Sequence, residues 1–273
     1  MGDVTQFLTE SFDRGLQYST MNIYRSALSA YHPEIEGHQV GKHPMVITLL
    51  RGMFNMKPPL PRYGDTWDVD VVLKHLKSWG TNTNLNLRQL SLKMTMLLAL
   101  VSASRGSELA QLNPLMMVDT GSSMTFHIAG LTKVKRPAKP HVKIVVSEYT
   151  EDPLLDPVAV LRHYLHTTKD TRVSEEQKKK LFLSFIRPHN PIAKNTIARW
   201  LKITLAEAGL DTGKYKAHSV RAASTSKASM KGLSTPMVLE RANWARASTF
   251  KKFYHRTTTQ TSDCYQDKVL TLA

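Results

Sequence analysis

A proline-rich segment near residue 60 divides the chain into two parts that must fold separately. The ten residues KPPLPRYGDT, 57–66, hold three prolines and one glycine. Proline lacks the backbone donor that a helix interior or a central strand requires, so no helix continues through this segment. The sequence therefore predicts an interdomain linker, with a small domain of residues 1–64 and a larger domain of residues 65–273.

The residues before the linker carry a helical pattern. Three segments, 3–15, 19–32 and 43–56, read as helices, and no alternation typical of a strand occurs among them. Ser19 is expected to cap the second helix, and Pro44 suits the first turn of the third.

Beyond the linker the pattern is again helical, with one exception. Residues 67–80 and 86–112 predict helices with one buried face each, and further helices are expected at 156–168, 195–210, 218–232, 234–245 and 247–256. The exception is a pair of β-rich runs, 123–129 and 141–147, around a loop with four basic residues and two prolines. This predicts a hairpin with a basic tip. The expected fold class is mainly α with a small β-hairpin or sheet.

The charge of the chain indicates a polyanionic partner. It has 37 Lys plus Arg against 22 Asp plus Glu, a formal net charge of +15 and a pI near 9.9. Nucleic acid is the stronger candidate and an anionic membrane the weaker one, because the longest apolar run, 94–103, is far shorter than the ~20 residues of a membrane-spanning helix. The N-terminus has no basic region followed by an apolar one, so a soluble intracellular protein is expected. Cys264 is the single cysteine, which excludes an intrachain disulfide and a thiolate zinc site.

Two pairs of polar residues interrupt segments that otherwise look buried. Arg105 and Glu108 follow an apolar helix three residues apart, where the ordinary alternative is an exposed salt bridge worth about 0.2–0.5 kcal/mol. His218 and Arg221 have the same spacing and are followed by small residues. For them the ordinary alternative is a helix start with a solvated arginine.

Two further places carry candidate residues. Lys133 and Lys135 lie on the basic loop, which could simply be a solubilising turn. Trp244 and Tyr254 lie in the basic stretch RANWARASTFKKFYHR, 241–256, where the tyrosine could simply anchor a helix contact.

Taken in order, these residues resemble the tyrosine recombinase (phage integrase) family. The family pattern has an Arg followed three residues on by Glu or Asp, a Lys on a β-hairpin, His-x-x-Arg, a His or Trp, and a nucleophilic Tyr. The matching residues in this chain are Arg105, Glu108, Lys133, His218, Arg221, Trp244 and Tyr254. The resemblance covers residues 67 to about 260, and its specificity comes from the order, because each element alone is weak.

The resemblance assigns a role to each matching residue. Arg105 and Arg221 would hold the non-bridging oxygens of a DNA phosphate, because a guanidinium stays charged and matches two oxygens at once. His218 and Trp244 would donate to the same phosphate. His218 would also accept the proton of the attacking Tyr254, since a tyrosine phenol ordinarily has a pKa of about 10.

The resemblance also implies the remaining parts of the reaction. Glu108 would orient Arg105 or His218, and Lys133 would protonate the leaving oxygen, with Lys135 as the close alternative. The product would be a 3′-phosphotyrosine and a free 5′-hydroxyl, with no metal and no cofactor, because the sequence has no carboxylate cluster of the two-metal kind. The residues expected to bind DNA are Lys135, Arg136, Lys251, Lys252 and Arg256.

The family resemblance extends to organisation and partners. The N-terminal helices look like the core-binding domain that clamps DNA, although shorter than usual, as if its first helix were missing. The phrases YRSALSAYH, HPMVITLLRGMFNMKPPLPRY and TWDV look most like the recombinases of DIRS-type retrotransposons. The implied partners are double-stranded DNA and further copies of the chain, from dimer to tetramer, without a membrane. A eukaryotic mobile element would place the protein in the nucleus, and any other source in the cytoplasm.

Three other functions fit parts of the sequence. A domesticated, catalytically idle DNA-binding domain would not need every motif position filled. A type IB topoisomerase shares the Arg, Lys, Arg, His and Tyr chemistry but relaxes supercoils without synapsis. A helical RNA-binding protein would leave the ordered motif unexplained.

Overall fold

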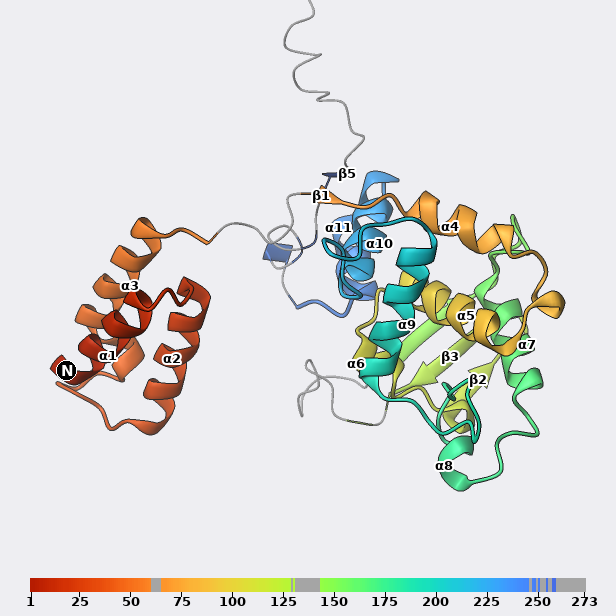
Figure 1. Cartoon of the computed structure of the whole chain (residues 1–273), viewed down its shortest axis with the longest axis horizontal. Coiled ribbons are helices and arrows are strands. Elements are labelled where there is room, and N and C mark those ends of the chain that lie inside the picture. The colour runs from red at the N-terminus through yellow and green to blue at the C-terminus, as the bar shows by residue number, and fades with distance from the viewer. Residues whose placement is uncertain are drawn as a thin grey trace, which may run out of the picture. The chain divides into compact units, whose positions relative to one another are not determined.

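The computed structural model describes residues 1–59, 65–128, 130, 143–245, 247–248, 250, 254 and 257–258. The chain forms two compact units, Met1–Arg62 and Tyr63–Ala273 (Figure 1). The expected boundary at residue 64 and the basic loop at 131–142 lie outside the described residues.

The first unit is a group of three helices, α1 (Gly2–Asp13), α2 (Tyr18–Tyr31) and α3 (Pro44–Met56), with the short 3-10 turn η1 (Val40–Lys42) before α3. They enclose a small core of Val4, Leu8, Met21, Val40, Val46, Leu50 and Met53. Pro44 opens α3 as predicted. The predicted cap at Ser19 is wrong, because α2 begins one residue earlier and is preceded by Gln17.

The second unit is built around α5 (Leu87–Ser102). The sequence predicted one buried face, but every residue from Leu90 to Leu100 is buried. The reason is that α7 (Pro157–Thr167), α9 (Lys194–Glu207), α10 (Ser219–Met230) and the sheet pack against it from several sides (Figure 1).

The predicted helix over 86–112 is in fact two helices. Ala103 adopts a positive φ of 48°, which ends α5 at Ser102. The one-turn helix α6 (Gly106–Leu109) follows in a new direction. This corner matters for function, because it carries Arg105 and Glu108.

The other helices of the second unit are α4 (Val69–Ser78), α8 (Glu175–Lys178) and α11 (Thr235–Arg241), with the 3-10 turns η2 (Asn82–Asn84) and η3 (Pro114–Met116). Asp156 caps α7, its carboxylate accepting a hydrogen bond of 2.9 Å from the Val158 amide. The predicted start of α9 at Asn195 is wrong by one residue, since the helix begins at Lys194.

The sheet has three antiparallel strands, β2 (Met117–Asp119), β3 (Ser123–His127) and β4 (Lys143–Ser147), in that order. The β3–β4 pair matches the predicted hairpin, whose alternate residues Met124, Phe126, Ile144 and Val146 are buried. The sequence missed β2, which is only three residues long. It also missed a parallel pair formed by β1 (Asp65–Thr66) and β5 (Thr257–Thr258), which joins residues far apart in the chain.

The end of the chain is described only in part. Residues 247, 248 and 250 are helical and Tyr254 lies in a turn, whereas the rest of the predicted 247–256 helix lies outside the described residues. Among the helices that are described, none is long and apolar enough to cross a membrane.

Candidate active site

Arg105 and Glu108 meet at the corner between α5 and α6. Glu108 is 2% exposed, and its two oxygens accept hydrogen bonds from Arg105, one from the amide and one from Nη1, each 2.8 Å long. The carboxylate therefore fixes both the backbone and the guanidinium of Arg105. The alternative of an exposed salt bridge is wrong, because the side chain of Glu108 is buried and that of Arg105 is only 19% exposed.

Arg221 lies on α10 and is also buried, with 2% of its side chain exposed. Its Nη1 is 3.8 Å from Glu108 Oε2, and its Nη2 donates to the carbonyl of Ala242. In the described part of the chain, Nε and Nη1 have no hydrogen-bond partner. The alternative of a solvated arginine is therefore wrong, and Arg221 has donors left over.

The surroundings of Arg221 disfavour its charge. Burial lowers the pKa of Arg221 to about 10, and the neighbouring charge of Arg105 acts in the same direction. Glu108 and Tyr254 oppose this shift. Among the described residues, Glu108 is the carboxylate that acts on these two cations, and an anion bound beside them would stabilise the site.

Trp244 and Tyr254 form an aromatic group against Arg221. The ring centroids of Trp244 and Tyr254 are 4.3 Å apart, and Arg221 Cζ lies 4.6 Å from the Trp244 ring. Trp244 is 8% exposed, and its indole Nε1 has no hydrogen-bond partner among the described residues. Phe250 stacks on Trp244 from another side. Tyr254 does pack against aromatic side chains, as expected of a tyrosine that anchors a helix contact. Its hydroxyl, however, makes a further contact.

That contact is with His218, the residue directly before α10. His218 Nε2 lies 2.9 Å from Tyr254 Oη. The next residue, Ser219, accepts a 2.9 Å hydrogen bond from the buried indole of Trp67, which fixes the start of α10 against the segment that follows the linker.

A cavity of about 290 Å³ opens beside these residues. It lies where α6, the first turn of α9 and the start of α10 meet. Arg105, His218 and Arg221 all line it, together with Lys194 and Asn195 from α9. The sequence analysis did not single out the last two. A Lys-Asn pair at a helix start is a weak signal, because nothing in the pattern says which cavity the helix faces.

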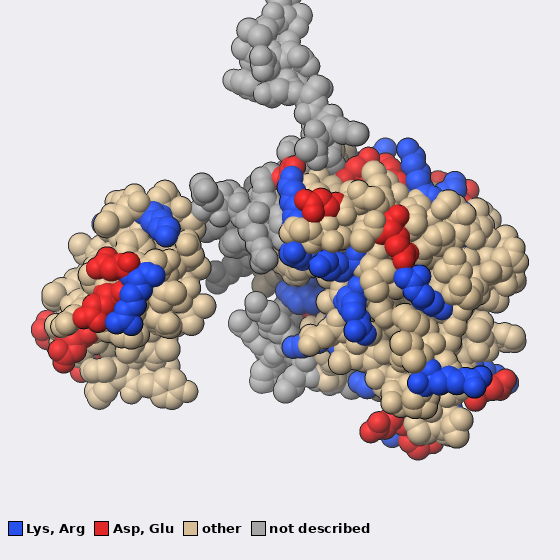
Figure 2. All heavy atoms as spheres, in the orientation of Figure 1, with Lys and Arg blue, Asp and Glu red and all other residues tan. Residues whose placement is uncertain are grey.

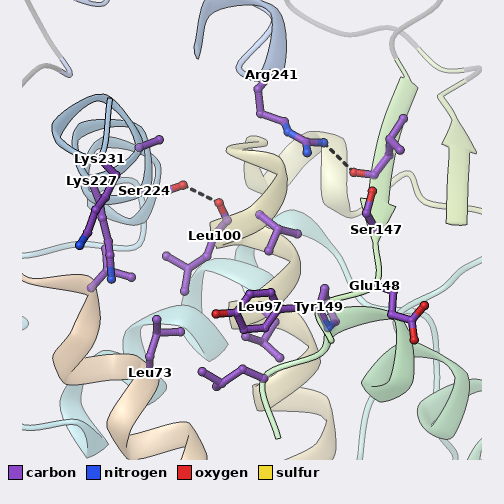
Figure 3. Close-up of a pocket in the computed structure, with 16 residues that line it drawn as sticks. Leu73, Leu97, Leu100, Ser147, Glu148, Tyr149, Ser224, Lys227, Lys231 and Arg241 are labelled. Carbon is purple, nitrogen blue, oxygen red and sulfur yellow. Dashed lines mark hydrogen bonds between the residues drawn. The ribbon is translucent and has the colours of Figure 1, made fainter. Parts of the chain in front are cut away.

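A second cavity, of about 470 Å³, lies between α4, α5, β4, α10 and α11 (Figure 3). Most of its lining is apolar, and it contains none of the matching motif residues. Two side chains hold its walls together, since Ser224 donates to the Leu100 carbonyl and Arg241 Nη1 donates to the Val145 carbonyl at 2.7 Å.

The structure leaves several predicted residues untested. Lys133, Lys135, Arg136, Lys251, Lys252 and Arg256 lie outside the described residues. Within the described ranges, no three His, Cys, Asp or Glu side chains come together as a metal site.

The charge is divided unequally between the two units. Residues 1–62 carry six Lys or Arg and five Asp or Glu. Residues 63–273 carry 31 Lys or Arg and 17 Asp or Glu. Figure 2 shows Lys and Arg spread over the visible face of the second unit. Nearly all of the excess positive charge is therefore on the unit that contains the candidate site.

The arrangement brings two arginines beside a tyrosine hydroxyl that contacts a histidine, a set of groups whose chemistry suits a phosphate-sized anion next to a nucleophile. The profile of the phage integrase family matches residues 72–260, well over half of the chain, and the chain belongs to that family. The expected fold class, mainly helical with a small antiparallel sheet, is confirmed. No curated protein matches the sequence.

Solved structures of the same fold include one recombinase and two integrases, each bound to DNA. XerH in its post-cleavage complex with palindromic difH has a TM-score of 0.61 and 12% identity, over 97% of this chain and 68% of that one. The Tn1549 transposon integrase in complex with transposon right-end DNA has a TM-score of 0.61 and 14% identity, over 99% of this chain and 85% of that one. A lambda integrase (75–356) dimer bound to a COC′ core site has a TM-score of 0.55 and 14% identity, over 96% of this chain and 81% of that one. Identities this low show the fold alone.

Proposed function

We propose that this protein is a site-specific DNA recombinase that cleaves and rejoins DNA strands through a 3′-phosphotyrosine intermediate. The observation that carries the proposal is the contact between Tyr254 and His218, 2.9 Å long, beside a cavity lined by Arg105 and Arg221. In this proposal Tyr254 is the nucleophile, His218 is the base, and the two arginines are the cations that bind the phosphate.

The proposed cleavage step transfers the 3′-phosphate of one DNA strand to Tyr254. The Tyr254 oxygen bonds to phosphorus while the bond from phosphorus to the 5′-oxygen breaks, and the phenol proton passes to His218. The leaving oxygen takes a proton from Lys133, or from Lys135 if that residue holds the role. The products are a 3′-phosphotyrosine and a 5′-hydroxyl, and attack by a 5′-hydroxyl of another strand reverses the step without ATP.

The remaining groups stabilise the charge that develops on the phosphate. Arg105 and Arg221 bind the non-bridging oxygens, and the Arg221 donors that have no partner among the described residues are available for this. The buried indole N–H of Trp244, which likewise has no partner in the described part of the chain, is a further donor. Glu108 keeps Arg105 in place through its two hydrogen bonds.

The partner in this proposal is double-stranded DNA. Residues 65–273 act as the catalytic domain, and residues 1–64 act as a short core-binding domain that completes the grip. Lys135, Arg136, Lys251, Lys252 and Arg256 contact the phosphate backbone. Because nearly all of the excess positive charge lies in residues 63–273, the catalytic domain would supply most of the electrostatic attraction to DNA.

The biological setting is part of the same proposal. The chain works as a dimer to tetramer on DNA and serves the integration of a DIRS-type mobile element in a nucleus. The support for assembly is that lambda integrase is described as a dimer on a core site and as a tetramer on a Holliday junction.

A trapping experiment tests the proposed chemistry. The protein is incubated with nicked duplexes of randomised sequence, in which the fragment that carries the 5′-hydroxyl diffuses away after cleavage. A covalent protein–DNA adduct is expected, and sequencing the trapped duplexes yields the target. DNA binding with no adduct would instead support the idle binding domain. Relaxation of a supercoiled plasmid with no strand exchange between duplexes would support the topoisomerase alternative.

A further inference from the structure

Helix α10 contacts Tyr254 at two places. His218, directly before the helix, meets the tyrosine hydroxyl, and Ser226, near its middle, donates a 2.6 Å hydrogen bond to the Tyr254 backbone carbonyl. Ser226 is fully buried at 0% exposure. One helix therefore contacts both the reactive end and the backbone of the same residue.

The hydroxyl of Ser226 makes an unusual bond for a helical serine. Ser and Thr side chains inside helices commonly donate to the carbonyl four residues earlier. Thr95, Ser102 and Thr204 do so in this protein. Ser226 instead donates to a carbonyl 28 positions away in the sequence. Its bond to Tyr254 is thus a tertiary tether.

The spacing of the two contacts restricts the tyrosine. His218 and Ser226 are eight residues apart, about 12 Å along a helix. A tyrosine held at its carbonyl and at its hydroxyl must lie along α10. Arg221 lies between the two, with its Cζ 5.8 Å from the Tyr254 ring centroid. Loss of the tether at the carbonyl would let the backbone of Tyr254 move while leaving Arg221 and His218 in place.

We propose that Ser226 is a positioning residue for the nucleophile. It sets the backbone of Tyr254 so that the hydroxyl reaches His218 and the bound phosphate. Ser226 is not among the residues that line the cavity beside Arg105 and Arg221, and its hydrogen bond reaches the backbone of Tyr254. The inference rests on the proposed function, because it assigns a partner to the residue that attacks.

Ser224 provides a matched control. It lies on the same helix and its hydroxyl also donates to a distant carbonyl, that of Leu100 on α5, which is a wall of the second cavity (Figure 3). Ser224→Ala therefore removes the same kind of bond from α10 without touching Tyr254.

The first measurement is the single-turnover rate of adduct formation on the trapped target duplex. Ser226→Ala is expected to slow it about 10- to 100-fold with DNA affinity unchanged, because a misplaced nucleophile loses rate and not binding. Ser226→Cys, which keeps a weak donor, should fall in between. Ser224→Ala should react like the wild type. If Ser226→Ala reacts as fast as wild type, or if Ser224→Ala slows as much as Ser226→Ala, the inference is wrong.

The second measurement separates positioning of the nucleophile from activation of the phosphate. In a Tyr254→Phe background, hydrogen peroxide can serve as the nucleophile, forming the bond to phosphorus and releasing the 5′-hydroxyl. Adding Ser226→Ala should leave this peroxide cleavage unchanged. An equal loss in both reactions would show that Ser226 merely supports the fold of the site. If the wild-type protein binds DNA and forms no adduct, the proposed function itself is wrong. A change in rate in the serine variants bears only on the role of Ser226.

Discussion

His218 Nε2 lies 2.9 Å from Tyr254 Oη, and this contact joins two residues 36 positions apart in the sequence. The two rings meet edge to face, with centroids 5.7 Å apart. Because the hydrogen-bonding contact uses the hydroxyl of Tyr254, removing that one oxygen atom tests it while the ring remains.

Tyr254→Phe should abolish the covalent adduct and leave DNA affinity nearly unchanged. The ring would keep its packing against Trp244, so only the nucleophile is lost. Gel detection of the adduct and a binding titration measure the two effects. Tyr265→Phe is the control, because Tyr265 lies in the same C-terminal region. Loss of the adduct in Tyr265→Phe, with Tyr254→Phe still active, would mean that the nucleophile has been misassigned.

Arg221→Met should fold at least as stably as the wild type at pH 7 and have no cleavage activity. The pKa of Arg221 in the folded state, about 10, lies below the ordinary value of an arginine, so the fold disfavours the charged form. Arginine is protonated in both states at pH 7, so this penalty is fully present there and is relieved only as the pH rises above about 10. Replacing it with an apolar side chain should change the free energy of unfolding by between 0 and about +3 kcal/mol.

Thermal unfolding at pH 7 measures this effect of Arg221→Met. The control is Arg199→Met on the exposed face of α9, where the change should stay within about 0.5 kcal/mol. A loss of more than about 2 kcal/mol in Arg221→Met would show that Arg221 is needed for the fold, and that its bonds outweigh the cost of its burial.

DNA affinity should fall steeply with salt. A chain of net charge +15 displaces counterions from several phosphates, and six to ten such contacts would cost about 10³–10⁵ in affinity between 50 and 200 mM salt. Because the excess charge lies in residues 63–273, Lys194→Gln should reduce the salt slope, whereas Arg25→Gln in the first unit should not. Fluorescence titrations over a salt series measure the slopes. Equal effects of the two variants would place phosphate contacts on both units.

Strand cleavage should survive an excess of chelator. The proposed step draws its charge stabilisation from arginines and its proton transfers from side chains, so it has no place for a metal ion. Adduct formation in EDTA, compared with the same reaction in Mg²⁺, is the measurement. Cleavage lost in EDTA and restored by Mg²⁺ would move the protein to a different mechanism.

Lys133→Ala should be badly impaired on ordinary DNA and largely rescued on a substrate with a 5′-bridging phosphorothiolate. A sulfur leaving group is far less basic than an alkoxide and does not need the proton that Lys133 would supply. Arg221→Ala should stay impaired on both substrates. Equal slowness of Lys133→Ala on both would show that the lysine binds phosphate. Fast cleavage of both would transfer the role to Lys135 or another residue.

The sequence predicted the local features of the fold well. The three N-terminal helices and the β3–β4 pairing follow from periodicity, which is a property of neighbouring residues. The errors concern a single residue and a very short strand. A single residue with positive φ, Ala103, divided one predicted helix into two, and β2 was too short to show a pattern.

For the site, the sequence by itself determined which residue types are present and in what order, from Arg105 to Tyr254. Only the tertiary structure decided that Arg221 is buried, with two donors that have no partner among the described residues, that His218 meets the tyrosine hydroxyl, and that Ser226 contacts the tyrosine carbonyl. The physical reason is that burial and distance depend on how α5, α6 and α10 pack together. Side-chain periodicity records which face of a helix is apolar, but it contains no information on what that face will meet.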